Sequence, residues 1–131
     1  MILADTSAWV ESLRETGSPV ARAFELARDG GRLVTTETVI GELLVGEVDD
    51  GRRQALLAGL LGVPLLSVGG VQGFVDAAEL YLQCRRAGVT VRKYTDCLIA
   101  VPAIRADAPV LHADRDFTAM ARVSSLQVVA V

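Results

Sequence analysis

Four acidic residues occupy positions from which carboxylates could do chemistry together. Asp5 directly follows a short apolar run, and Asp114 follows another at one residue's remove. Asp96 opens an apolar helical segment, and Glu42 lies inside a second one. Carboxylates a few ångströms apart raise one another's pKa unless a cation neutralises them. Because Mg²⁺ and Mn²⁺ prefer all-oxygen ligands, four converging carboxylates predict a divalent-cation site that could activate water against a phosphodiester.

Each acid also has a simpler interpretation. An aspartate near a helix N-terminus accepts hydrogen bonds from free amides, so Asp5, Asp96 and Asp114 could be helix caps. Glu42 could be a solvated carboxylate on an amphipathic helix. Considered alone, these interpretations are favoured for Asp96 and Glu42. They leave unexplained why three strand-to-helix junctions and one helix interior all carry an acid.

The elements that must position these acids alternate in kind. Brief apolar runs bounded by turn or polar residues predict buried strands at Ile2–Ala4, Leu33–Thr35, Pro64–Val68, Pro109–His112 and Gln127–Val131. Apolar residues at helical spacing predict helices over Ser7–Glu15, Pro19–Arg28, Thr36–Gly46, Gly51–Leu61, Gln72–Ala87, Thr95–Ala106 and Asp116–Val123. This alternation predicts a three-layer α/β/α domain with a central parallel five-stranded sheet. Ligands bind at the carboxyl ends of such strands, where Asp5 and Asp114 would lie.

Composition sets broad limits on the protein. The chain has 131 residues, of which 51% are hydrophobic and 22% charged, so we expect one globular domain over residues 1–131. The net charge of -3 is unusual for a nucleic-acid binder, but a cluster of metal-binding acids would lower it without excluding a basic rim. His112 is the only histidine, which disfavours a zinc site and histidine-based acid–base catalysis.

Three further features bear on the cellular compartment and the core. No basic or apolar leader precedes Asp5, so we expect a cytoplasmic protein. The uncharged segment from Gln54 to Val75 is interrupted by glycines and a proline, which favours a helix end, a short strand and a turn over a membrane span. Cys84 and Cys97 are expected to be buried and reduced.

Four short segments form an ordered set that spans most of the chain. They are Leu3–Ser7 (LADTS), Glu42–Gly46 (ELLVG), Thr95–Ala100 (TDCLIA) and Leu111–Phe117 (LHADRDF). Each is weak by itself. In this order and at these separations they resemble the PIN-domain ribonucleases, specifically the VapC-type toxins of bacterial toxin–antitoxin pairs.

The resemblance implies a set of site residues. By position, the family's acidic tetrad and its frequent fifth acid fall on Asp5, Glu42, Asp96, Asp114 and Asp116. Thr6 or Ser7 matches the hydroxyl that usually follows the first acid and could steady a ligand or a water. His112 stands where many relatives have threonine or serine. We favour a structural role for His112 over a substrate contact, since it closes a buried strand.

The resemblance also implies an activity and partners. It implies Mg²⁺- or Mn²⁺-dependent endonuclease cleavage of RNA, often tRNA or ribosomal RNA, that leaves a 5′-phosphate and a 3′-hydroxyl. It further implies a homodimer neutralised by a small VapB-type antitoxin.

Contacts to RNA would need positive charge outside the acidic centre. The candidates are Arg85, Arg86, Arg92, Lys93 and Arg115, of which Arg92 and Lys93 stand just before Asp96. Ordinary surface solvation is the alternative for these cations. Trp9 lies on an apolar helical stripe, which predicts packing in the core or in an antitoxin groove rather than stacking on a base.

Two rival functions compete with a ribonuclease. An aspartate-based phosphatase or receiver domain also places an acid after the first strand, but the phosphatase pattern wants a second aspartate where this chain has Ser7, and no acids precede Asp5 as in a receiver. A catalytically inactive PIN-like binding module is the other rival. Loss of one or more acids would indicate it, and every acid is present here.

Overall fold

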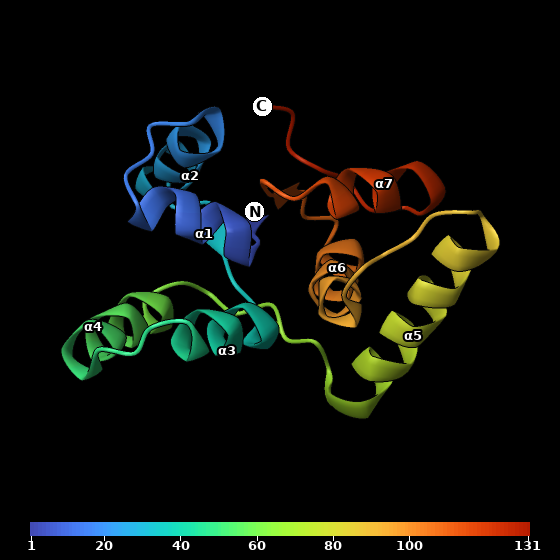
Figure 1. The fold of residues 1–131 in the computed structure, drawn as a ribbon, viewed down its shortest axis with the longest axis horizontal. Helices are drawn as coiled ribbons and strands as arrows, with labels where there is room; N and C mark the ends of the chain where they lie inside the picture. Colours follow the sequence, from blue (N-terminus) through green and yellow to red (C-terminus); the bar gives the residue numbers. More distant parts are fainter.

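Seven helices surround a short parallel sheet in the computed structural model, which describes all residues 1–131 (Figure 1). The strands are β1 (Ile2–Ala4), β2 (Leu33–Val34) and β3 (Val110–Leu111). The helices are α1 (Thr6–Leu13), α2 (Pro19–Asp29), α3 (Glu37–Val45), α4 (Asp50–Leu61), α5 (Gly70–Arg86), α6 (Tyr94–Ala106) and α7 (Arg115–Val123). Every helix predicted from the sequence is present, with its ends within two residues of the prediction.

The sheet is parallel in the order β2-β1-β3, which confirms the predicted fold class. The sheet has three strands rather than the predicted five. The two outer segments contribute one bridge each, between Thr35 and Leu65 and between Val110 and Val128. These segments lie at the sheet edges, where Leu65 is 51% exposed. The prediction of strands in these segments assumed that both of their faces are buried. An exposed edge does not meet that condition.

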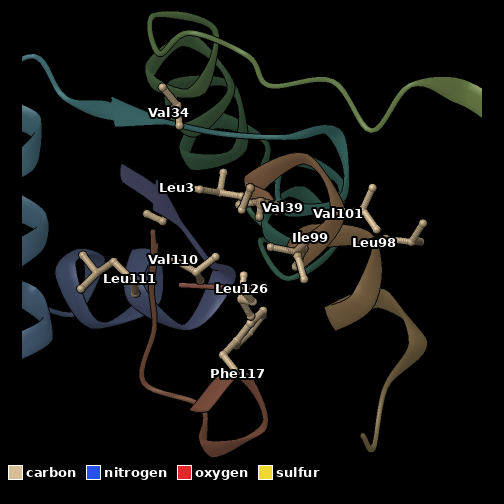
Figure 2. Packing of buried hydrophobic residues seen from close by; sticks show 14 of the residues in the cluster. Leu3, Val34, Val39, Leu98, Ile99, Val101, Val110, Leu111, Phe117 and Leu126 are labelled. Atoms are coloured by element: carbon tan, nitrogen blue, oxygen red, sulfur yellow. The ribbon is translucent and has the colours of Figure 1, made fainter. Parts of the chain in front are cut away.

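Both faces of the sheet are covered. Figure 2 shows Leu3 and Val110 on the same side as Val39 of α3 and Ile99 of α6, whereas Leu111 points to the opposite side. Successive residues of a strand point to opposite faces. Helix α2 contacts β2 and β3, and α1 packs on α2. The result is a three-layer arrangement in which the carboxyl ends of β1 and β3 meet at one edge.

Helix α6 is the central helix, and its position matters for the site at its N-terminus. Every residue from Asp96 to Ala103 in it is buried. A helix that is apolar all round belongs in the interior, and Figure 1 shows α6 between α3, α5 and α7. Helix α6 contacts all three of these helices.

Two expectations about the core, for Trp9 and for the two cysteines, are confirmed. Trp9 is 7% exposed and packs edge-on against Phe24, with ring centroids 4.8 Å apart. Cys84 and Cys97 are buried and unpaired, and burial raises the pKa of the Cys97 thiol to about 12. No helix is long and apolar enough to cross a membrane. The uncharged segment divides into the end of α4, a bridge at Leu65 and the start of α5.

Candidate metal centre

Asp5 lies at the junction of β1 and α1, where it is 3% exposed. It is the N-cap of α1, and its Oδ2 accepts hydrogen bonds from the Ser7 amide at 3.2 Å and the Ser7 hydroxyl at 2.6 Å. Burial raises the pKa of Asp5, the hydrogen bonds from Ser7 and Thr6 oppose that rise, and the charge of Glu42 adds to it. The cap interpretation is correct for Asp5, and it leaves Oδ1 without a protein hydrogen bond.

Glu42 faces the start of α1 rather than bulk solvent. The Thr6 hydroxyl donates to Glu42 Oε1 at 2.7 Å, and the Thr95 hydroxyl lies 3.5 Å from Oε2. Glu42 is half-buried, and its charge acts on the carboxyls of both Asp5 and Asp96. Side chains from α1 and α6 thus hold this helix-interior glutamate beside the other acids.

Asp96 differs from the other acids because its buried carboxylate lacks hydrogen-bond partners. The N-cap of α6 is Lys93, which makes no side-chain cap bond, so Asp96 is a first-turn residue and not the cap. It is 2% exposed, and its Oδ2 has no hydrogen-bond partner. Lys93 Nζ lies 4.0 Å from Oδ1, at the limit of an ion pair.

The electrostatic consequence is a raised pKa at Asp96. Burial raises the pKa of Asp96 to about 7, Lys93 opposes the rise, and the charges of Asp5, Asp114 and Glu42 add to it. Buried polar atoms are almost always satisfied by a hydrogen bond, so the free Oδ2 requires an explanation. A cation bound there would supply one.

Asp114 and Asp116 form the remaining side of the cluster. Asp114 is the N-cap of α7, and its Oδ1 accepts from the Asp116 amide at 3.0 Å. Arg92 bridges the two acids: Nη2 lies 2.9 Å from Asp114 Oδ1, and Nε lies 3.0 Å from Asp116 Oδ2. Asp116 lies in the first turn of α7 and is not its N-cap.

His112 supports the loop that carries Asp114. Its Nδ1 accepts from the Asp114 amide at 3.2 Å, and its ring packs on Phe117 with centroids 5.4 Å apart. Burial lowers the pKa of His112, and Asp5 and Asp114 oppose that effect. These contacts fit the structural role that the sequence favoured.

The predicted site residues therefore converge. Carboxylate oxygens of Asp96, Asp114 and Asp116 all lie within 4.8 Å of one another, and Asp5 and Glu42 act electrostatically on the same Asp96. This donor set is all oxygen, and it contains a buried oxygen without a partner. Both properties fit a hard divalent cation such as Mg²⁺ or Mn²⁺.

The predicted basic residues divide into two groups. Arg92 and Lys93 lie against the acids, although their side chains remain 54% and 58% exposed. Arg115 is exposed and lines a hollow of about 390 Å³ together with Asp116 and Thr118. Arg85 and Arg86 are exposed at the end of α5 and contact none of the acids.

Two contacts at the site were missed from the sequence. Thr95, which was noted only as part of a motif, approaches Glu42. Ser7 was noted only as a hydroxyl after the first acid, but its Oγ also accepts from the Ala113 amide at 2.9 Å and so ties the end of β1 to the end of β3. No local pattern signals a contact across more than a hundred residues.

The largest cavity is separate from the acids. It has a volume of about 710 Å³, and residues of α5, α6 and the end of α7 line it, including Asp76, Arg105 and Arg122. None of the five clustered acids lines this cavity. Two of the clustered acids line smaller hollows elsewhere, Glu42 beside Thr6 and Asp116 beside Arg115.

Comparison with known proteins gives the family. The PIN domain family model matches residues 2–123. Ribonuclease VapC11 of Mycobacterium tuberculosis is 43% identical over 129 residues, which covers 97% of this chain and 96% of that relative. A VapC ribonuclease of Mycobacterium bovis has the same identity and coverage. The chain therefore belongs to the PIN domain family and, within it, to the VapC ribonucleases.

Solved structures agree with this fold. A chain from VapBC2 of Rickettsia felis, bound to a DNA fragment from their promoter, superposes with a TM-score of 0.75 at 19% identity and covers 98% of each chain. A chain from VapBC-5 of Mycobacterium tuberculosis gives a TM-score of 0.64 at 25% identity, covering 98% of this chain and 97% of that one. Both are crystal structures of VapBC assemblies.

Proposed function

We propose that this chain is an endoribonuclease that depends on Mg²⁺ or Mn²⁺. Its metal ligands and catalytic acids are Asp5, Glu42, Asp96 and Asp114, with Asp116 as a fifth acid. The observation that carries this proposal is the buried, unpartnered Asp96 Oδ2 in the middle of the acidic cluster. Membership of the VapC ribonucleases supports the same activity.

The side chains of this protein would orient the reacting groups. When bound, a divalent cation neutralises charge on a phosphodiester and lowers the pKa of an attacking water. Ser7 fixes Asp5 through Oδ2, and Thr6 fixes Glu42 through Oε1. The bonds from Ser7 leave Asp5 Oδ1 for a ligand, and Glu42 Oε2 meets only the distant Thr95 hydroxyl at 3.5 Å, a contact that a ligand could replace. Asp96 must lose its proton to serve as a ligand, and binding of a cation favours that loss.

We propose a structured RNA as the substrate, of the tRNA or ribosomal RNA class. Lys93 lies 4.0 Å from Asp96, and Arg115 lines a hollow together with Asp116, so both would contact phosphates. Arg92 has one terminal nitrogen, Nη1, without a protein partner. Attack by water would leave a 5′-phosphate and a 3′-hydroxyl. The large cavity at α5 contains none of the five acids, so we do not place the RNA there.

We also propose the biological setting of the enzyme. The solved relatives are VapBC assemblies, which supports a small VapB-type antitoxin as the partner that neutralises this chain. A homodimer, a cytoplasmic location and a single domain over residues 1–131 complete the proposal.

The test is to map RNA cleavage in cells. Induction of the wild-type chain, followed by sequencing of RNA 5′-ends, is expected to give new ends at a small number of positions in structured RNA. An Asp5→Asn variant should give none of them, because it removes one charged ligand while preserving the shape of the side chain. Identical new ends with both proteins would contradict the proposed site.

A further inference from the structure

Arg92 is the only cation that contacts two of the clustered acids. It stands in the segment between α5 and α6, directly after the buried Val91. The sequence left RNA contact and surface solvation open for it, and the structure adds a contact with Asp114 and Asp116. This contact is inward, although the side chain is 54% exposed.

The contact has a fixed geometry. Asp116 Oδ2 accepts from two groups of Arg92, the backbone amide at 3.2 Å and Nε at 3.0 Å. The same guanidinium donates from Nη2 to Asp114 Oδ1 at 2.9 Å. A planar guanidinium presents its donors in a rigid fork, so the positions of the two carboxylates are tied to each other. A lysine has one nitrogen in place of this fork and could not tie them in the same way.

The contact also leaves oxygens free. Arg92 engages Asp114 through Oδ1 and Asp116 through Oδ2, and neither Asp114 Oδ2 nor Asp116 Oδ1 accepts a protein hydrogen bond. Asp96 Oδ2 is free as well. Each of the three acids therefore keeps one oxygen available while Arg92 stays in place.

We propose that Arg92 is a positioning residue that orients Asp114 and Asp116 toward the bound cation through one oxygen of each. It acts through these carboxylates and does not itself touch the ion. Groups that hydrogen-bond to metal ligands fix the orientation of those ligands, and their loss typically weakens metal binding by about 10- to 100-fold. The inference rests on the proposed function, because it requires that the acids bind a cation.

The experiment separates geometry from charge. Mn²⁺ affinity is measured without RNA by titration calorimetry and by the electron paramagnetic resonance signal of free Mn²⁺, on the intact chain. Arg92→Lys retains the positive charge and removes the fork, so we expect Mn²⁺ affinity to fall about tenfold. If Arg92 acted only through its charge, the lysine variant would bind Mn²⁺ as the wild type does, and the proposal would be overturned.

The matched control is Arg28→Lys. Arg28 also pairs with an aspartate, Asp29, and is 55% exposed, but it lies on α2 away from the acids. Its lysine variant is expected to bind Mn²⁺ with unchanged affinity. A fall equal to that of Arg92→Lys would overturn the inference, since it would show an effect common to any arginine. Circular dichroism melts of the metal-free variants establish that both are folded.

Failure of the inference is distinguishable from failure of the proposed function. If the wild type binds Mn²⁺ and Arg92→Lys binds it equally well, only the role of Arg92 is refuted. If the wild type itself binds no Mn²⁺, the metal-dependent function is refuted, and the role of Arg92 with it. Asp96→Asn serves as the reference for a lost ligand.

Discussion

Four helices carry an acid in their first turn, and two of these acids, Glu37 of α3 and Asp96 of α6, have opposite surroundings. Glu37 begins α3 at the surface, where its carboxylate accepts from the Val68 amide, the Ser67 hydroxyl and the Thr36 hydroxyl. Asp96 lies in the first turn of α6, is 2% exposed, and has an oxygen without any partner. A buried carboxylate normally needs hydrogen-bond partners more than an exposed one does. Here the exposed Glu37 has three partners, and the buried Asp96 has an oxygen with none.

The pKa values of the two acids follow from these surroundings. Burial acts to raise the pKa of Glu37, but hydrogen bonds from its own amide, Val68, Ser67 and Thr36 outweigh it and lower the pKa. At Asp96 burial prevails and raises the pKa to about 7. Glu37 therefore fastens the segment after α4 to α3, whereas the carboxylate of Asp96 has no comparable structural partner, which is the property that the proposed metal site requires.

The largest expected difference is in catalysis. Asp96→Asn should reduce RNA cleavage by at least about 100-fold, because loss of a direct ligand exceeds the usual effect of a group behind a ligand. The matched variant Glu37→Gln should cleave at close to the wild-type rate below its melting temperature. Cleavage of a labelled RNA by purified proteins measures both. Normal activity of Asp96→Asn would remove Asp96 from the site.

The next difference is in the pH dependence of stability without metal. The folded pKa of Asp96, about 7, lies above its ordinary value of 3.8, so between these values the folded state binds more protons than the unfolded state. The free energy of unfolding should therefore fall as pH rises from about 4 through 7, by up to about 4 kcal/mol at about 1.4 kcal/mol per pKa unit.

Variants of Asp96 and Glu37 test which acid causes this pH dependence. Asp96→Asn should reduce the decline between pH 4 and 7 to the part that Asp5 contributes, because burial also raises the pKa of Asp5; urea denaturation at a series of pH values measures this. Glu37 has a lowered pKa, so its contribution is present at neutral pH and is lost as pH falls through the acid range. Glu37→Gln should leave the decline between pH 4 and 7 in place. An undiminished decline in Asp96→Asn would assign the whole effect to another group.

The smallest expected difference is in thermal stabilisation by metal. Mg²⁺ or Mn²⁺ at about 100 times its dissociation constant should stabilise the wild type by about 2.7 kcal/mol, because a ligand that binds only the native state adds to its stability. Glu37→Gln should show the same rise in Tm from a lower starting value, and Asp96→Asn should show little or none. Scanning calorimetry measures these shifts in Tm. Equal shifts in all three proteins would show that the ion does not bind at Asp96.

The sequence predicted the fold more completely than the site. Apolar periodicity is local, so all seven helices and the three inner strands could be derived from it. The outer strands were predicted too long, since an apolar run such as Pro64–Val68 does not reveal that Leu65 lies at an open edge. Edge position is a property of the assembled sheet.

Within the site, the limits of local inference are visible at two residues. The cap interpretation is correct for Asp5, where a neighbouring amide two residues on is the partner. It fails for Asp96, whose surroundings come from Asp5, Glu42 and Asp114 on other elements. Only the ordered set of motifs, and not any single spacing, brought Asp96 and Glu42 into the predicted site.

The sequence by itself determined which carboxylates are present, which strands precede two of them, and the family that their order resembles. Only the tertiary structure decided that Ser7 joins the ends of β1 and β3, that Arg92 bridges Asp114 and Asp116, and that one oxygen of Asp96 has no partner. The physical reason is that hydrogen bonding and burial depend on groups distant in the chain. Their meeting is set by the packing of α6 and α7 at the edge of the sheet.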